Sequence, residues 1–168
     1  TVALNTGAAE IGTAALTGAA QVLAEELGID LADINVVSAD TFSTPFDFGA
    51  QGSRTAFAVG NACRAAAVDL KRQIFALAAA QLGVEPDTLA LADKHVVADG
   101  KRLSLADLAR LSQQTGGGLI THGTFIAPPT PYDPQRVEGH VYPAFHSPSF
   151  HAHAVDLSVD PETGEVRL

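Results

Sequence analysis

The sequence predicts an α+β fold of two layers, in which a mixed sheet carries helices packed on one face. Two observations support this fold class. In the first half, strand-like runs and long stretches with apolar residues at steps of three and four follow the order strand, helix, strand, loop, helix. In the second half, the turn signals Asp93-Lys94 and Asp99-Gly100 flank short apolar runs, which indicates antiparallel strands.

Length and composition restrict the class of protein further. The 168 residues suffice for one domain, or for one lobe of a larger protein, and 46% hydrophobic residues with 17% charged residues are typical of a globular chain. A net charge of -9 argues against nucleic acid as a partner, and no apolar run is long enough to span a bilayer. We expect residues 1–168 to be a single lobe of a longer chain, because the sequence starts with Thr1 and contains no methionine.

The first expected elements are a strand, a helix and a second strand. Residues 1–5 alternate in the manner of a strand, and Gly7 separates them from the helix. Gly28 is expected to end that helix in the left-handed conformation, and residues 34–37 form the next strand. The apolar residues that share one face of the helix are Leu16, Ala19, Ala20, Leu23 and Leu27.

The longest helical pattern follows a glycine-rich loop that starts at Asp40, and it continues to Leu82. Its apolar face, which makes this helix part of the core, consists of Val59, Cys63, Ala66, Leu70, Ile74 and Leu77. Since Cys63 is the only cysteine and lies on this face, we expect it to be a small buried hydrophobic residue.

The junction between the loop and this helix has the features of an anion site. The first backbone N–H groups of a helix have no internal partner and lie at the positive end of the helix dipole. Gly49 and Gly52 allow close approach of the backbone, Ser53 and Thr55 supply hydroxyl groups, and Arg54 supplies a positive charge that suits a phosphate. Plain capping of the helix is the alternative explanation of the same residues.

A helix-to-strand unit occurs twice in the sequence. Residues 82–85 followed by 89–91 match residues 27–30 followed by 34–36 in residue type and spacing. After the second copy, Ser104 and Asp107 resemble a capping box for a short helix.

The remainder of the chain is expected to contain strands and a connector. Residues 119–126 are apolar enough to form a strand, and the four prolines within 127–134 predict an extended connector. Residues 160–164 are a turn signal between a strand at 154–159 and a final strand.

Histidines near the end of the chain raise the alternative of a metal-binding module. On a strand, His151 and His153 would point the same way, but no cysteine and no nearby pair of carboxylates completes a ligand set. We therefore predict no metal site and expect these residues on a half-exposed strand. The histidines concerned are His140, His146, His151 and His153.

Four segments, taken in their order and spacing, resemble the molybdopterin-binding large subunit of the molybdenum hydroxylases. This family comprises xanthine dehydrogenases, aldehyde oxidoreductases and aerobic carbon monoxide dehydrogenases. The segments are 9–12 with 24–28, the Asp-Thr and Thr-Pro pairs within 40–45, the run 52–55 with 60–62, and 159–166.

The resemblance implies two cofactor-binding segments. The first holds the pyranopterin phosphate or its nucleotide extension, and it consists of Gln51, Gly52, Ser53, Arg54 and Thr55. The second lies beside the molybdenum and the pterin, and it consists of Gly12, Thr13 and Ala14. In the family a Gln-Gly pair stands where this chain has Thr13-Ala14, and threonine is too short to repeat the reach of an amide. The implied cofactor is molybdenum-molybdopterin, with the cytidine dinucleotide form as one option.

The implied function is cofactor binding within a molybdenum hydroxylase that oxidises an aldehyde, an N-heterocycle or a similar small molecule. The implied partners are the remainder of the large subunit and iron–sulfur or FAD electron-transfer subunits. The glutamate base of the family belongs downstream of Leu168, so no catalytic residue is assigned and the isolated chain is expected to be inactive. A cytoplasmic location is expected, with the periplasm as the alternative. The main rival is a cofactor-free structural or assembly relative, which the Thr13-Ala14 pair favours; the histidine module is the second.

Overall fold

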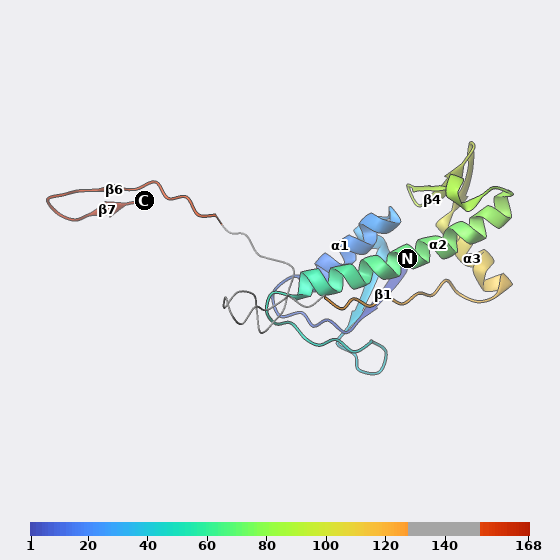
Figure 1. The fold of residues 1–168 in the computed structure, drawn as a ribbon, viewed down its shortest axis with the longest axis horizontal. Helices are drawn as coiled ribbons and strands as arrows, with labels where there is room; N and C mark the ends of the chain where they lie inside the picture. The colour runs from blue at the N-terminus through green and yellow to red at the C-terminus, as the bar shows by residue number, and fades with distance from the viewer. Residues whose placement is uncertain (128–151) are drawn as a thin grey trace, which may run out of the picture.

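The computed structural model describes residues 1–127 and 152–168 (Figure 1). The first half contains β1 (Val2–Thr6), α1 (Ala15–Leu27), β2 (Ile34–Ser38) and the long helix α2 (Thr55–Leu82). The order strand, helix, strand, loop, helix is thus confirmed. The second half contains β3 (Ala90–Ala92), β4 (His95–Ala98), β5 (Lys101–Ser104) and α3 (Leu105–Thr115), and the last part contains β6 (Ser158–Val159) and β7 (Val166–Arg167).

Strands β1 and β2 are parallel and are joined through α1. Their register pairs Val2 with Ile34 and Thr6 with Ser38. Parallel neighbours require a crossover, and a helix is its usual form, so β1, α1 and β2 make one βαβ unit. Consequently the loops that follow β1 and β2 leave the same edge of the sheet.

Helices α1 and α2 lie side by side and run in the same direction (Figure 1). Gly60 of α2 faces Val22 of α1, and one turn further along the Nε atom of Arg64 donates to Glu26 at 2.8 Å. Small residues let the two helices approach closely. The buried residues at their amino-terminal halves form a cluster of Ala8, Ala19, Val59 and Cys63, so Cys63 is buried as predicted.

The predicted apolar face of α2 is largely confirmed, with a small rotation. Four of the six predicted residues are buried: Val59, Cys63, Leu70 and Ile74. At the other two positions the next residue along the chain is buried instead, Ala67 rather than Ala66 and Ala78 rather than Leu77. The main hydrophobic cluster joins the carboxyl-terminal part of this face to Leu23 and Leu27 of α1 and to Val96 and Leu108; the α2 residues concerned are Ala67, Leu70, Ile74 and Ala78.

The repeated helix-to-strand unit is also confirmed. After α1, Gly28 is left-handed at φ 58° and a short 3-10 turn (Leu31–Asp33) leads into β2. After α2, Gly83 is left-handed at φ 70° and a second 3-10 turn (Pro86–Thr88) leads toward β3. The copies then diverge, because β3 pairs with β4 in antiparallel fashion.

The turns and the helix cap predicted for the second half are present. The pairs Asp93-Lys94 and Asp99-Gly100 have positive φ, as tight hairpin turns require, and connect β3, β4 and β5. At the start of α3, Oγ of Ser104 accepts from the N–H of Asp107 at 3.0 Å.

The strand predicted for residues 119–126 is wrong. This segment is extended but pairs with no strand in the described parts of the chain, because it lies along α2 instead. Oγ1 of Thr121 donates to Oδ2 of Asp69 at 2.9 Å, and the ring of Phe125 packs against the ring of Phe57 at 5.1 Å between centroids. A Cβ on Gly123 would lie 2.1 Å from the carbonyl oxygen of Ala62, so the two backbones touch there.

At the end of the chain, the predicted hairpin turn at 160–164 is confirmed, but the strand predicted for 154–159 is too long. Only Ser158 and Val159 pair, with Val166 and Arg167. The proline-rich connector and the predicted strand positions of His140, His146 and His151 lie outside the described residues.

The α+β class is confirmed. Parallel and antiparallel pairs are both present, and in the described residues they form three small sheets, β1-β2, β3-β4-β5 and β6-β7.

Candidate functional site

Two loops meet at the edge where β1 and β2 end. The first loop covers residues 7–14 and leads into α1, and the second covers residues 39–54 and leads into α2. Gly7 marks their contact, since a Cβ on Gly7 would lie 2.1 Å from the carbonyl oxygen of Pro45 and 2.9 Å from the backbone nitrogen of Asp47. Only glycine permits this approach. In open α/β structures, the crevice outside the carboxyl ends of parallel strands is where ligands bind.

A carboxylate organises the first loop. Oε1 of Glu10 accepts from the N–H groups of Gly12 and Ala14 at 2.8 and 3.0 Å, and Oε2 accepts from the N–H of Leu16 at 3.4 Å. Desolvation opposes ionisation of this carboxyl, but the backbone N–H groups outweigh it, with Leu16 first, and hold the pKa of Glu10 below its usual value. Ala14, the N-cap residue of α1, has no side chain that could accept a hydrogen bond, and the carboxylate of Glu10 caps the helix instead.

Ala14 occupies a backbone conformation that favours glycine. Its φ is 54° and its ψ is 31°, in the left-handed region. A residue with a Cβ costs roughly 1 to 2 kcal/mol there. This cost is a physical reason why the Gln-Gly pair of the family has glycine where this chain has Ala14.

The second loop is closed by its own charged side chains. Nη1 of Arg54 donates to the carbonyl oxygen of Gly49 at 3.0 Å and lies 3.8 Å from Oδ1 of Asp47, which accepts from the N–H of Gly49 at 2.7 Å. The guanidinium also lies 5.8 Å from the centre of the Phe48 ring. With 17% of its side chain exposed, Arg54 is folded over the loop rather than extended into solvent.

At the amino end of α2, backbone donors have no partner in the part of the chain that the structure describes. Arg54 at the N-cap makes no side-chain cap, and within residues 1–127 and 152–168 the N–H groups of Thr55, Ala56 and Phe57 meet no acceptor. Gly52 and Ser53, which precede the helix, are exposed and left-handed at φ 54° and 58°. Among the described residues, the amino end of α2 thus differs from that of α1, where Glu10 accepts from the backbone N–H groups.

The residues predicted to bind the cofactor divide accordingly. Gln51, Gly52 and Ser53 lie exposed before α2, Thr55 is its first residue, and Arg54 is half-buried and folded over the loop. Gly12, Thr13 and Ala14 lie exposed before α1, where Glu10 already binds two of their N–H groups. Sequence reasoning missed the roles of Glu10 and Asp47, although each lies two residues before a glycine, the spacing at which a carboxylate reaches a backbone N–H.

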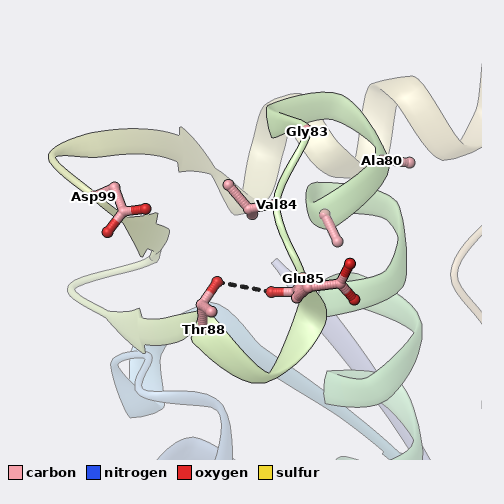
Figure 2. Close-up of a pocket in the computed structure, with 7 residues that line it drawn as sticks. Ala80, Gly83, Val84, Glu85, Thr88 and Asp99 are labelled. Atoms are coloured by element: carbon pink, nitrogen blue, oxygen red, sulfur yellow. Dashed lines mark hydrogen bonds between the residues drawn. The ribbon is translucent and has the colours of Figure 1, made fainter.

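A separate open pocket lies at the other end of α2. A cavity of about 470 Å³ at the carboxyl end of α2 is lined by Gly83, Glu85, Thr88 and Asp99, and Oγ1 of Thr88 donates to the carbonyl oxygen of Glu85 at 2.7 Å beside it (Figure 2). It is open and shares no residue with the loops at the other end of that helix. The loops remain the candidate site, because backbone donors and left-handed residues lie together there.

Two further expectations concern metals and membranes. Among the described residues, no group of three or more His, Cys, Asp or Glu side chains could hold a metal ion, and His153 is exposed. No described helix is both long enough and apolar enough to cross a membrane.

These features define a class of protein: a βαβ unit with a following helix, whose two loops meet at the carboxyl edge of the parallel strands. The sequence profile of the molybdopterin cofactor-binding domain matches residues 1–168. The chain therefore belongs to the family of molybdopterin cofactor-binding domains of xanthine dehydrogenase and aldehyde oxidoreductase type.

Individual relatives agree with this assignment. A putative xanthine dehydrogenase molybdenum-binding subunit of Escherichia coli is 33% identical over 168 residues, covering 95% of this chain and 20% of that protein. An aldehyde oxidoreductase molybdenum-binding subunit of Escherichia coli is 30% identical over 168 residues, covering all of this chain and 20% of that protein. The chain thus spans about a fifth of the length of these relatives.

Solved structures agree as well. A CO dehydrogenase of Oligotropha carboxidovorans superposes with a TM-score of 0.60 at 28% identity, over 70% of this chain and 15% of that one. A quinoline 2-oxidoreductase of Pseudomonas putida shares the fold, with a TM-score of 0.61 at 24% identity over 73% of this chain and 17% of that one.

Proposed function

We propose that the two loops hold the molybdopterin cofactor, with its anionic group at the amino end of α2. The observation that carries this proposal is the set of three N–H groups, of Thr55, Ala56 and Phe57, that meet no acceptor in the described residues. They follow directly on a loop whose backbone is exposed at Gly52 and Ser53. A phosphate is the ligand that such a helix end binds best.

The residues of the second loop have distinct proposed roles. Gly52 and Ser53 turn the backbone so that it approaches the ligand, and Ser53 and Thr55 add hydroxyl donors. Nη1 of Arg54 stabilises the loop through Gly49, whereas its Nη2 and Nε atoms have no partner among residues 1–127 and 152–168 and can donate to an anion. Gln51 lies at the exposed rim.

The first loop faces the other end of the cofactor in this proposal. The hydroxyl group of Thr13 has no hydrogen-bond partner in the described residues, and it is the group that can reach a ligand from this loop. Gly12 and Ala14 contribute shape, because their N–H groups are bound to Glu10. The molybdenum cofactor, when bound, supplies a metal that takes up electrons from a substrate; the chain binds and orients it.

The whole protein is proposed to oxidise an aldehyde, an N-heterocycle or a similar small molecule, as the names of its relatives suggest. Those names also describe subunits of complexes, so we propose the remainder of a large subunit and iron–sulfur or FAD subunits as partners. The cytidine dinucleotide form of the cofactor and a cytoplasmic location belong to the same proposal. Nucleotide release after acid treatment and cell fractionation test these last two points.

The cofactor proposal is tested by the molybdenum and pterin content of the full-length protein and two arginine variants. Arg54→Ala should lower the content about tenfold or more, since hydrogen bonds to charged groups contribute roughly 1.5 to 3 kcal/mol. The matched control is Arg102→Ala, because Arg102 is exposed on β5 and its recorded contact is with His95 at 3.3 Å. Equal content in the two variants would contradict the role of Arg54.

The rival reading, a cofactor-free structural or assembly relative, makes a different prediction for the same measurement. It predicts no molybdenum and no pterin in the unmodified full-length protein, whatever residue stands at position 54. Pterin near one equivalent per polypeptide would reject that rival directly.

A further inference from the structure

The amino ends of α1 and α2, which both lie at the candidate site, differ in whether a carboxylate accepts from their backbone N–H groups. At α1, the carboxylate of Glu10 accepts hydrogen bonds from Gly12, Ala14 and Leu16 at 2.8, 3.0 and 3.4 Å. At α2, no described carboxylate has this position, although the preceding loop contains two. Asp40 accepts from the N–H of Phe42, and Asp47 accepts from the N–H of Gly49, each within its own turn.

At α1, the carboxylate of Glu10 is bound by backbone N–H groups in the way that a helix end binds a free anion. A carboxylate that accepts several backbone N–H groups at a helix start satisfies donors that would otherwise be orphaned, and it interacts favourably with the helix dipole. Two of those N–H groups belong to Gly12 and Ala14, which the family resemblance assigns to cofactor binding. With both donors bound to Oε1 of Glu10, neither is available to an incoming phosphate.

We propose that Glu10 is a positioning residue: its carboxylate occupies the amino end of α1 as an internal anion, so that the anionic group of the cofactor is bound at the amino end of α2. This inference rests on the proposed function. Glu10 also fixes the backbone around Thr13 and holds Ala14 in its left-handed conformation, at φ 54°, without the help of a glycine. Glu10 thus determines both the shape of the first loop and the location of the negative charge of the ligand.

The test compares Glu10→Ala with Glu25→Ala in the full-length protein. Glu25 lies exposed on α1, and its side chain makes no hydrogen bond or ion pair with the described residues, so Glu25→Ala controls for the loss of a negative charge on the same helix. We expect Glu10→Ala to lower the pterin content about fivefold, the ratio that corresponds to loss of a typical helix cap. Sodium formate should restore most of the content, whereas sodium chloride at equal concentration should not.

A second variant separates positioning from stability. Gly18 lies within α1, and a Cβ added there meets nothing within 4 Å, so Gly18→Ala should strengthen the helix. In the double variant Glu10→Ala, Gly18→Ala, the thermal midpoint should rise toward that of the unmodified protein while the pterin content stays low. Recovery of the pterin content in this double variant would mean that Glu10 acts only through helix stability, which would overturn the inference.

Further outcomes are equally decisive. Glu10→Gln keeps one acceptor oxygen and loses the charge, so it should fall between the unmodified protein and Glu10→Ala; full pterin content and an unchanged thermal midpoint in Glu10→Gln would reject the internal anion. Should Glu10→Ala fail to fold, Glu10→Gln alone gives the answer. Should the unmodified protein contain no pterin, the proposed function fails, whereas the formate effect on the thermal midpoint of Glu10→Ala still tests Glu10.

Discussion

Gly7 and Pro45 touch at the point where the two candidate loops meet. A Cβ on Gly7 would lie 2.1 Å from the carbonyl oxygen of Pro45, which is far inside van der Waals contact. Because Gly7 follows β1 and Pro45 follows β2, this contact couples the segment before α1 to the segment before α2. The separation of the two loops is therefore set by the absence of a side chain at position 7.

The first prediction concerns that contact. Gly7→Ala should destabilise the protein by about 1 to 3 kcal/mol, as overpacking does, and should lower its pterin content because the loops move apart. Thermal unfolding and pterin analysis of the full-length protein measure both effects. The matched control is Gly18→Ala, where the added methyl group has free space and should stabilise α1 by roughly 0.5 to 1 kcal/mol. If Gly7→Ala behaved like Gly18→Ala, the close contact would be refuted.

The second prediction concerns the segment that lies along α2. In Gly123→Ala the new Cβ would be 2.1 Å from the carbonyl oxygen of Ala62 and 2.6 Å from the backbone nitrogen of Ala66, so the segment should detach locally. Hydrogen exchange and limited proteolysis of residues 119–127 should become faster, because few other contacts protect an extended segment. Gly118→Ala is the control, since its nearest neighbour is the Ile120 side chain at 3.9 Å. Equal exchange in both variants would speak against the packing.

The third prediction concerns pH. Hydrogen bonds from Arg72 first, and then from Gln73 and Thr121, hold the pKa of Asp69 below its ordinary value of 3.8. A carboxyl whose pKa is lowered by folding stabilises the folded state above the ordinary value, and this contribution is lost as the pH falls toward the folded-state pKa. The difference in thermal midpoint between the unmodified protein and Asp69→Asn should thus be constant near neutral pH and shrink below about pH 4.

The control for this titration is Asp87→Asn, a change of the same kind at an exposed residue of the second 3-10 turn. Its effect on the thermal midpoint should be small, because the side chain is exposed. A difference for Asp69→Asn that stayed constant down to the most acidic measurement would mean that the carboxylate of Asp69 contributes nothing to stability.

How far the sequence predicts the structure depends on the range of the interactions involved. Periodicity and glycine positions predicted α1, α2 and the repeated helix-to-strand unit, because helix ends and tight turns are local. Residues 119–126 are apolar enough to form a strand, yet an apolar extended segment can pack on the surface of a helix as well as beside a neighbouring strand. The segment packs on α2 because Gly123 lets its backbone touch the backbone of Ala62. This contact joins distant parts of the sequence, so no local pattern predicts it.

The candidate site shows the same division. The exposed position of residues 51–53 before a helix could be predicted, since glycine and serine at a helix start have local meaning. The occupation of the α1 end by Glu10 could not, because it depends on a left-handed Ala14 that returns the N–H groups toward the preceding carboxylate. A conformation that alanine rarely adopts is outside what propensities predict.

The last prediction concerns the backbone of the loop before α2. Gly52 and Ser53 are both left-handed, at φ 54° and 58°. Valine is strongly disfavoured in this region, because its branched Cβ collides with the neighbouring carbonyl group, whereas serine and alanine differ little there. Gly52→Val should therefore abolish most of the pterin content of the full-length protein, while Ser53→Ala should reduce it by less than about fivefold, the loss of one neutral hydrogen bond. Ser53→Gly should keep the turn and raise the thermal midpoint slightly, since glycine adopts φ 58° without strain. The reverse ranking, with Ser53→Ala severe and Gly52→Val mild, would show that the serine hydroxyl rather than the backbone turn makes the decisive contact with the cofactor.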